Sequence, residues 1–300
     1  MKILKTALAL LIIGSALHAS SEVTTGSEDL RKLPSNYDMI VAFYGRPGSK
    51  ALGILGHYPL EKVFDEVKVY AAKYEKALDG TRHVTPGLEI IYEMATVSPG
   101  AKGDHVLTLP EKKVLAYIEA AKKNHAVVIL DVQLGKKSPA ESIKPLLKYL
   151  HYDNVHLAID PEFYVGNLSV RPGKKIGSIS GEQINEAQKL MSDYLKTQNI
   201  PEDKILVVHS FTEHMVTNKK AVKYHDKIHV ILNLDGHGSP SLKVKIYNGL
   251  YTENRAAKIS GGFKLFFKQD HPMMTPKQVL GLEPVGNKRV KDMPKFINYQ

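Results

Sequence analysis

The 300-residue sequence contains no cysteine and no tryptophan. Without cysteine, the chain has no disulfide bond, no thiolate nucleophile and no sulfur ligand for a metal. A lipid-anchored lipoprotein is also excluded, because its lipid is attached to a cysteine. The absence of tryptophan removes the indole rings on which sugars commonly stack, so a sugar-binding site would have to use some of the 15 tyrosines.

Several sequence signatures of catalysis and nucleotide binding are missing as well. The sequence has no G-x-S-x-G nucleophile elbow, no Walker A loop, no H-E-x-x-H motif and no EF-hand loop. Residues 45–48 read G-R-P-G, which does not match the dinucleotide-binding fingerprint G-x-G-x-x-G. These absences count against an esterase with a nucleophile elbow, a P-loop NTPase and a dinucleotide-dependent enzyme.

The amino terminus has the pattern of a secretory signal peptide. Lys2 and Lys5 precede an apolar stretch at residues 7–17, and small residues follow up to residue 21. The apolar stretch is too short to span a bilayer, so we expect a signal peptide over residues 1–20, cleaved after Ala16 or Ala19. The expected location is therefore secreted or periplasmic, with no stable membrane span after cleavage.

Composition and charge limit the partners that we expect. Hydrophobic residues make up 43% of the chain, which is enough for a substantial core, and the formal net charge is +10. The lysines have mainly helix-surface spacing and are not interleaved with aromatic residues, so we expect no nucleic-acid partner. Anionic polysaccharide is the kind of acidic surface that a basic exported protein would meet.

After a polar segment at residues 21–35, which we expect to be flexible, apolar runs alternate with amphipathic stretches. This alternation predicts β-α-β units and a parallel sheet, and eight units predict one (β/α)8 barrel domain over residues 36–300. The expected strands cover residues 39–44, 84–92, 126–132, 155–159, 175–179, 204–209, 228–234 and 262–267. The expected helices cover residues 60–78, 110–124, 139–150, 181–198, 218–224, 241–251 and 275–282. Residues 161–174 show no helical period, so we expect an irregular fourth crossover.

Three of these apolar runs end in the same way, with an acid followed two residues later by a second polar group. Residues i and i+2 of a strand face the same side, so each run carries a matched polar pair at its carboxyl end. In a (β/α)8 barrel the active site lies at the carboxyl ends of the strands. The pairs are Asp131 with Gln133, Asp160 with Glu162, and Asp235 with His237.

Other polar side chains are expected at the same rim. Carboxylates that crowd one mouth repel one another unless they are protonated or paired with cations, and this crowding separates their pKa values as acid/base catalysis requires. We expect the carboxylates and His209 to take part in catalysis or in metal binding. The remaining expected substrate-binding residues are Tyr44, Glu89, Gln133, Tyr164, His237, Lys264 and Asp270.

Asp160-Pro161-Glu162 resembles the D-x-E motif on the fourth strand of chitinase-like and related retaining glycoside hydrolases. That resemblance implies that Glu162 is the general acid and that Asp160 orients a neighbouring group, with help from Tyr164. Either Asp131 or Asp235 is expected to be the second carboxylate, and retention or inversion stays open.

The chain as a whole also resembles a group of uncharacterised secreted bacterial proteins that look like TIM-barrel glycoside hydrolases. The group implies a fold and the place of a site, without a substrate. The matching segments are residues 44–48, 130–133, 156–162, 208–212, 235–238, 262–266 and 299–300.

The leading hypothesis is therefore an exported glycoside-hydrolase-like protein that acts on a glycan without a cofactor. A metal-dependent hydrolase or phosphodiesterase with Asp131, Asp160, His209 and Asp235 as ligands is the first alternative. A barrel without catalysis that binds acidic polymer through its lysines is the second.

Overall fold

The computed structural model describes the backbone of residues 33–256 and 259–300. The predicted signal peptide lies outside the described residues, as does most of the segment 21–35 that we expected to be flexible. No helix among the described residues has both the length and the apolar character needed to cross a membrane.

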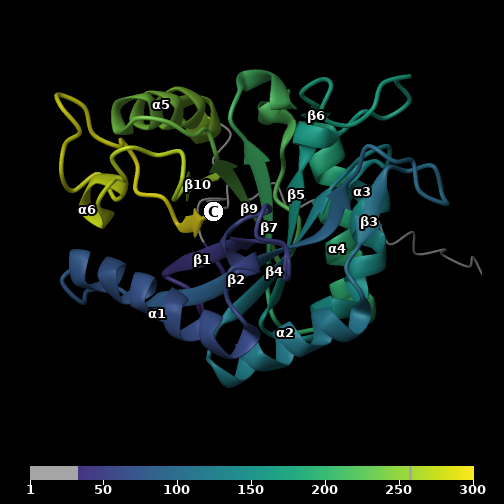
Figure 1. Cartoon of the computed structure of the whole chain (residues 1–300), viewed down its shortest axis with the longest axis horizontal. Coiled ribbons are helices and arrows are strands. Elements are labelled where there is room, and N and C mark those ends of the chain that lie inside the picture. The colour runs from purple at the N-terminus through teal and green to yellow at the C-terminus, as the bar shows by residue number, and fades with distance from the viewer. Residues whose placement is uncertain (1–32, 257–258) are drawn as a thin grey trace, which may run out of the picture.

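Eight parallel strands form a closed barrel (Figure 1). β1 pairs with β2 on one side and with β11 on the other, which closes the sheet. The predicted (β/α)8 fold is therefore confirmed. In order around the barrel, the strands are β1 (Met39–Gly45), β2 (Val84–Ala95), β4 (Val127–Gln133), β5 (Val155–Asp160), β7 (Lys204–Ser210), β9 (Ile228–Leu234), β10 (Ser260–Leu265) and β11 (Phe296–Tyr299).

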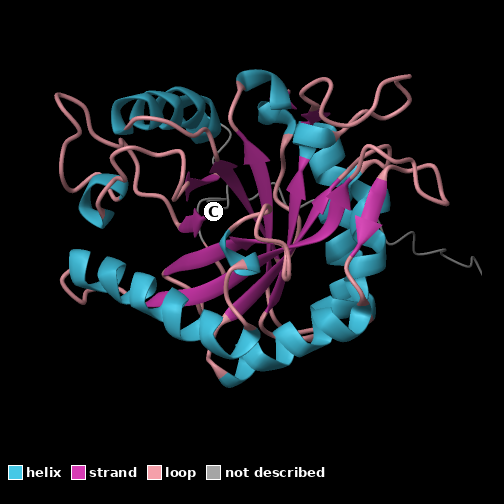
Figure 2. Cartoon of the chain, viewed as in Figure 1, coloured by secondary structure: helices cyan, strands magenta, loops and turns pink. Residues whose placement is uncertain are grey.

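Helices lie outside the barrel strands (Figure 2). The longer helices carry an apolar stripe that packs on the barrel, as in α1, where Val63, Val67 and Tyr74 are fully buried. The helices are α1 (Leu60–Ala77), α2 (Glu111–Lys123), α3 (Pro139–Ile143), α4 (Gly181–Thr197), α5 (Pro240–Ala256) and α6 (Pro276–Val279). The 3₁₀ turns are η1 (Ile54–Gly56), η2 (Lys144–His151), η3 (Pro161–Phe163), η4 (Glu213–Met215) and η5 (Lys219–Ala221).

Small strands outside the barrel account for the remaining pairings. β3 (Val106–Thr108) lies antiparallel to the end of β2, and β6 (Ile179–Ser180) pairs with β8 (Val216–Thr217).

Four sequence-based expectations about the elements need correction. The helix expected at 275–282 is reduced to the four residues of α6. Residues 175–179 do not form a barrel strand, because their backbone is clamped onto η3 and only Ile179 enters the short β6. The helix expected at 218–224 is reduced to η5, since Asn218 adopts a left-handed conformation at its start. The eighth strand is β11, which we did not predict because it has only four residues and Asn298 interrupts its apolar run.

The irregular stretch at residues 161–174 is confirmed, since it contains only η3. It leads through β6 into α4, whose first turn is fixed by a capping box between Ser180 and Gln183. The irregular part is therefore a long loop at the carboxyl end of β5, and the crossover itself contains a regular helix.

Alternating side chains divide the barrel strands between two cores. One set packs between the strands and the helices, and the other fills the barrel interior with small and branched residues such as Ala42, Ile129, Ala158, Val207 and Ile231. This apolar layer fills the barrel interior below the carboxyl ends of the strands. Polar side chains two residues further along each strand lie above it, at the carboxyl ends.

Candidate active site

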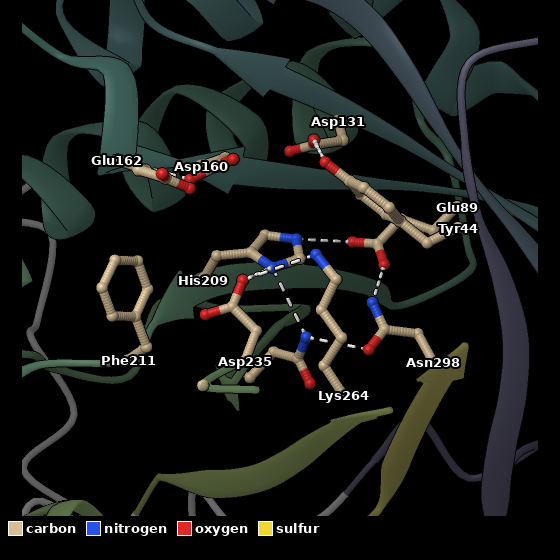
Figure 3. A network of polar contacts seen from close by, with 12 residues as sticks. Tyr44, Glu89, Asp131, Asp160, Glu162, His209, Phe211, Asp235, Lys264 and Asn298 are labelled. Carbon is tan, nitrogen blue, oxygen red and sulfur yellow. Dashed lines mark hydrogen bonds and ion pairs between the residues drawn. The ribbon is translucent and has the colours of Figure 1, made fainter. Parts of the chain in front are cut away.

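Every one of the eight barrel strands contributes a polar side chain to one layer at the carboxyl end of the barrel (Figure 3). The strand register brings these residues to one level, since Tyr44 pairs with Glu89, and His209 pairs with Asn233. All of them are at least nine-tenths buried. The layer consists of Tyr44 (β1), Glu89 (β2), Asp131 (β4), Asp160 (β5), His209 (β7), Asn233 (β9), Lys264 (β10) and Asn298 (β11).

His209 lies at the centre of this network. Its Nε2 is 2.8 Å from Glu89 Oε1, and its Nδ1 is 3.1 Å from Asp235 Oδ2. Burial alone would lower the pKa of His209, but Glu89 and Asp235 outweigh that effect and raise the pKa well above its ordinary value. His209 is therefore an imidazolium that donates one hydrogen bond to each carboxylate.

Lys264 supplies the second positive charge. Its Nζ lies 3.4 Å from Asp235 Oδ2 and 3.7 Å from the centroid of the Tyr44 ring. Burial would raise the pKa of Asp235, but the charges of Lys264 and His209 lower it below its ordinary value. Asp235 is therefore ionised. Its Oδ1 has no hydrogen-bond partner among the described residues.

Two asparagines that we did not single out from the sequence position Glu89. Asn298 donates a hydrogen bond to Glu89 Oε2, and Asn233 Nδ2 donates to Asn298 Oδ1 at 3.1 Å. Gly262 makes room for Asn233, because a Cβ at position 262 would lie 2.6 Å from Asn233 Oδ1. Each asparagine therefore helps to fix the carboxylate that charges His209.

Asp131 has the opposite electrostatic environment to Asp235. Its Oδ2 accepts a hydrogen bond of 3.0 Å from the Tyr44 hydroxyl. Burial, helped by the nearby charges of Asp160 and Glu89, raises the pKa of Asp131 to about 8. At neutral pH, Asp131 is therefore mainly a neutral carboxylic acid.

Asp160 and Glu162 form a turn at the end of β5. Asp160 Oδ1 accepts a hydrogen bond of 3.0 Å from the Glu162 backbone N–H, and Pro161 starts η3 between them. Burial raises the pKa of both carboxyls, and burial together with the charge of Asp160 brings the pKa of Glu162 to about 7. Glu162 at this turn lines a pocket over the network.

A pocket of about 440 Å³ opens over this network. Glu162, Asp235 and Lys264 supply charged groups to its wall. Aromatic and apolar side chains supply the rest of the surface, as ligand pockets commonly combine the two. These further lining residues are Phe163, Phe211, Gly236, His237, Ile246, Phe266 and Gln300.

The other predicted substrate-binding residues lie at different distances from the pocket. His237 lines the pocket, with its ring 5.8 Å from that of Phe266. Gln133 accepts a hydrogen bond of 2.9 Å from the Ala95 N–H and so ties β4 to the end of β2. Tyr164 is half-buried against the core. Gln133 and Tyr164 are not among the described residues that line the pocket.

Asp270 is buried behind the pocket wall. It accepts hydrogen bonds of 2.8 Å from the N–H groups of Gly238 and Phe266, and it pairs with Lys243 at 2.9 Å. Lys243 also donates to the Gly236 carbonyl at 2.7 Å. Asp270 therefore fastens the loop that follows Asp235 to the end of β10.

The donor set does not fit the metal site that we considered as an alternative. Within the described parts of the chain, no three His, Asp or Glu side chains converge as metal ligands. Both nitrogens of His209 are engaged by carboxylates, and a protonated imidazole has no lone pair for a metal. The same contacts leave His209 without a free nitrogen to act as a base.

Comparisons with known proteins find similarity to solved structures, with low sequence identities and TM-scores. No protein-family model matches the sequence, and no curated protein matches it. A GH18 chitinase from Pseudoalteromonas aurantia matches 87% of this chain and 93% of its own, with 13% identity and a TM-score of 0.41. A family 18 chitinase from Crocus vernus matches 76% and 79% at 13% identity and a TM-score of 0.40. A candidate alpha-L-fucosidase from Bacteroides thetaiotaomicron matches 93% and 91% at 10% identity and a TM-score of 0.41.

At TM-scores of 0.40 to 0.41 and identities of 10% to 13%, these similarities carry no argument about this chain. The chemistry of the site has to be judged from its own residues.

Proposed function

We propose that the protein is a glycoside hydrolase that acts on a glycan, with Glu162 as general acid and Asp235 as the second carboxylate. One observation carries the proposal. Both carboxyls line the same pocket, but the pKa of Glu162 is raised to about 7 and the pKa of Asp235 is lowered. Glycoside hydrolysis needs two carboxyls whose pKa values are shifted in opposite directions, because one must donate a proton while the other is ionised.

Glu162 holds the proton for the leaving group. With a pKa of about 7, its carboxyl is largely protonated under mildly acidic conditions and can protonate the glycosidic oxygen as the C–O bond breaks. Asp160 orients Glu162 through the hydrogen bond to its backbone N–H. The charge of Asp160 also helps to raise the pKa of Glu162.

Asp235 acts on the other side of the scissile bond, either as nucleophile at the anomeric carbon or as base toward water. His209 and Lys264 both contact its Oδ2, so the negative charge is stabilised, while Oδ1 is buried and has no hydrogen-bond partner among the described residues. Between the two carboxylates that the sequence offered, the pKa values favour Asp235 over Asp131. Asp131, with a pKa of about 8, would still be neutral at a pH at which Glu162 is protonated.

Hydrolysis assays on a panel of glycans test the proposal. We expect Glu162→Gln and Asp235→Asn each to lower kcat/KM by at least about 100-fold, since acid/base catalysis contributes roughly 10²- to 10⁴-fold. Glu186→Gln is the matched control, because Glu186 is exposed on α4. Unchanged activity in Glu162→Gln would remove Glu162 from the mechanism.

We also propose that the chain is exported. The proposal rests on the sequence pattern of residues 1–20, with Lys2 and Lys5 before a short apolar stretch. Amino-terminal sequencing of the protein recovered outside the cytoplasm should begin after Ala16 or Ala19. A full-length product retained in the cytoplasm would contradict it.

A further inference from the structure

A second, smaller hollow shares one lining residue, Glu162, with the pocket. Its volume is about 150 Å³, and Glu162 lines both this hollow and the 440 Å³ pocket. The rest of its wall comes from the loop at the carboxyl end of β5, where the residues are Gly173, Lys174, Lys175 and Ile176. The proposed general acid thus borders both hollows.

The backbone fixes this loop against η3. The Gly177 N–H donates a hydrogen bond of 2.8 Å to the Glu162 carbonyl. A Cβ at position 177 would lie 2.1 Å from the Pro161 carbonyl oxygen and 2.5 Å from that of Tyr164, so only glycine permits this approach. Lys174 and Lys175, just before Gly177 in the chain, are held beside Glu162 as a result.

The loop carries an uncompensated positive charge. Residues 165–178 include Arg171, Lys174 and Lys175 and no acidic residue. All three side chains are exposed. In the part of the chain that the structure describes, neither lysine has an ion-pair partner. Their ammonium groups are therefore available to an anion.

We propose that the 150 Å³ hollow binds a sugar that bears an anionic group, a carboxylate or a sulfate, through Lys174 and Lys175. This inference rests on the proposed function, because a general acid protonates the oxygen that joins the sugars on its two sides. One hollow then holds the sugar that is attacked, and the other holds the leaving sugar. The substrate class is accordingly an acidic glycan.

The charge distribution decides which of the two hollows takes the anionic sugar. The 440 Å³ pocket contains the ionised Asp235, which would repel an anion, and its wall includes Phe163, Phe211 and Phe266. Such a surface suits the apolar face of a neutral sugar ring. The lysine of that pocket, Lys264, is paired with Asp235, whereas Lys174 and Lys175 have no acidic partner among the described residues, so the anionic sugar belongs in the leaving-group hollow.

Binding measurements with matched charged and neutral oligosaccharides test this inference. Calorimetry in the Glu162→Gln background avoids consumption of the probes. The probes are tetragalacturonate and its methyl ester, a sulfated chondroitin tetrasaccharide and its desulfated form, and neutral chitotetraose. We expect at least one charged probe to bind more tightly than its neutral counterpart, and its affinity to fall steeply with salt.

Two variants distinguish the effect of the charges of Lys174 and Lys175 from the effect of the position of their loop. Lys174→Gln/Lys175→Gln should weaken binding of the charged probe by about tenfold, from the loss of two charge-assisted hydrogen bonds, and leave the neutral counterpart unaffected. Gly177→Ala should also weaken binding of the charged probe, although every charge is kept. The control Lys122→Gln/Lys123→Gln removes two exposed lysines of α2 and should change nothing.

The inference is overturned if no charged probe binds more tightly than its neutral form, or if the loop variant and the α2 control behave alike. Hydrolysis assays report separately on the proposed function. Charged-probe binding that depends on Lys174 and Lys175, combined with hydrolysis that is indifferent to Glu162→Gln, would refute the acid role and keep the anion site.

Discussion

The proposed acid predicts a specific response of activity to pH. The pKa of Glu162 is about 7, so its protonated fraction falls from about nine-tenths at pH 6 to about one-tenth at pH 8. Since the pKa of Asp235 is lowered, that carboxylate stays ionised over the whole interval. We therefore expect kcat/KM to fall roughly tenfold between pH 6 and pH 8 as Glu162 loses its proton.

If Asp131 rather than Asp235 were the second carboxylate, kcat/KM would change with pH in the opposite direction. If Asp131 had to be ionised, its pKa of about 8 would make activity rise between pH 6 and pH 8. The assay is kcat/KM from pH 5 to pH 9 on the glycan identified by the panel, with circular dichroism to confirm that the protein stays folded. A rate that rises through this interval would refute the assignment of Asp235 and Glu162.

Lys264→Met extends the test to the cause of the pKa shifts. Lys264 lowers the pKa of Asp235 and also that of Glu162. Its removal should raise both pKa values, so the alkaline limb should move to higher pH and an acid limb should appear where none was expected. A profile that keeps its shape in Lys264→Met would contradict the electrostatic role of this lysine.

Two further variants probe the network by stability. Tyr44→Phe removes the hydrogen bond to Asp131 and keeps the ring, so urea denaturation should show a free energy of unfolding lower by about 1–3 kcal/mol. An unchanged free energy of unfolding would mean that the hydroxyl does not stabilise the network. Gly262→Ala should lower the free energy of unfolding by about 1–3 kcal/mol, because the new Cβ would overlap Asn233. The control Gly249→Ala should not destabilise the protein, because the space around Gly249 in α5 is open. Equal effects of the two substitutions would argue against the steric explanation.

The rim of the site could be predicted from the sequence because strand ends carry a local signal. Apolar runs that end in Asp131, Asp160 and Asp235 are visible in the chain, and parallel strands bring their carboxyl ends to one edge. The expectation that these three side chains meet at one mouth agrees with the network in Figure 3.

The pairing within the rim could not be predicted in the same way. His209 contacts Glu89 across the barrel, although the two are 120 positions apart in the chain. No local pattern marks such a contact, and the same holds for Asn298, whose four-residue strand is too short to give a periodic signal. The roles of His209 as a cation and of Asn298 as a support for Glu89 therefore emerge only from the fold.

The loop after β5 shows a different limit of sequence reasoning. Residues 175–179 look like a strand because two isoleucines surround a glycine, but Gly177 is there to allow close approach to η3. That approach is a contact with Pro161 and Tyr164, which a strand pattern does not encode. Because we expected a strand here, we did not predict that Lys174 and Lys175 lie beside Glu162.

Strand order explains why Glu162 and Asp235 differ. β9, which carries Asp235 at its end, lies between β7 with His209 and β10 with Lys264, so cations flank it on both sides. β5, which leads to Glu162, has His209 on one side only and Asp131 on the other. The arrangement of strands around the barrel thus ionises one carboxylate and protonates the other, and neither state could be inferred from the three-residue motif that first pointed to the site.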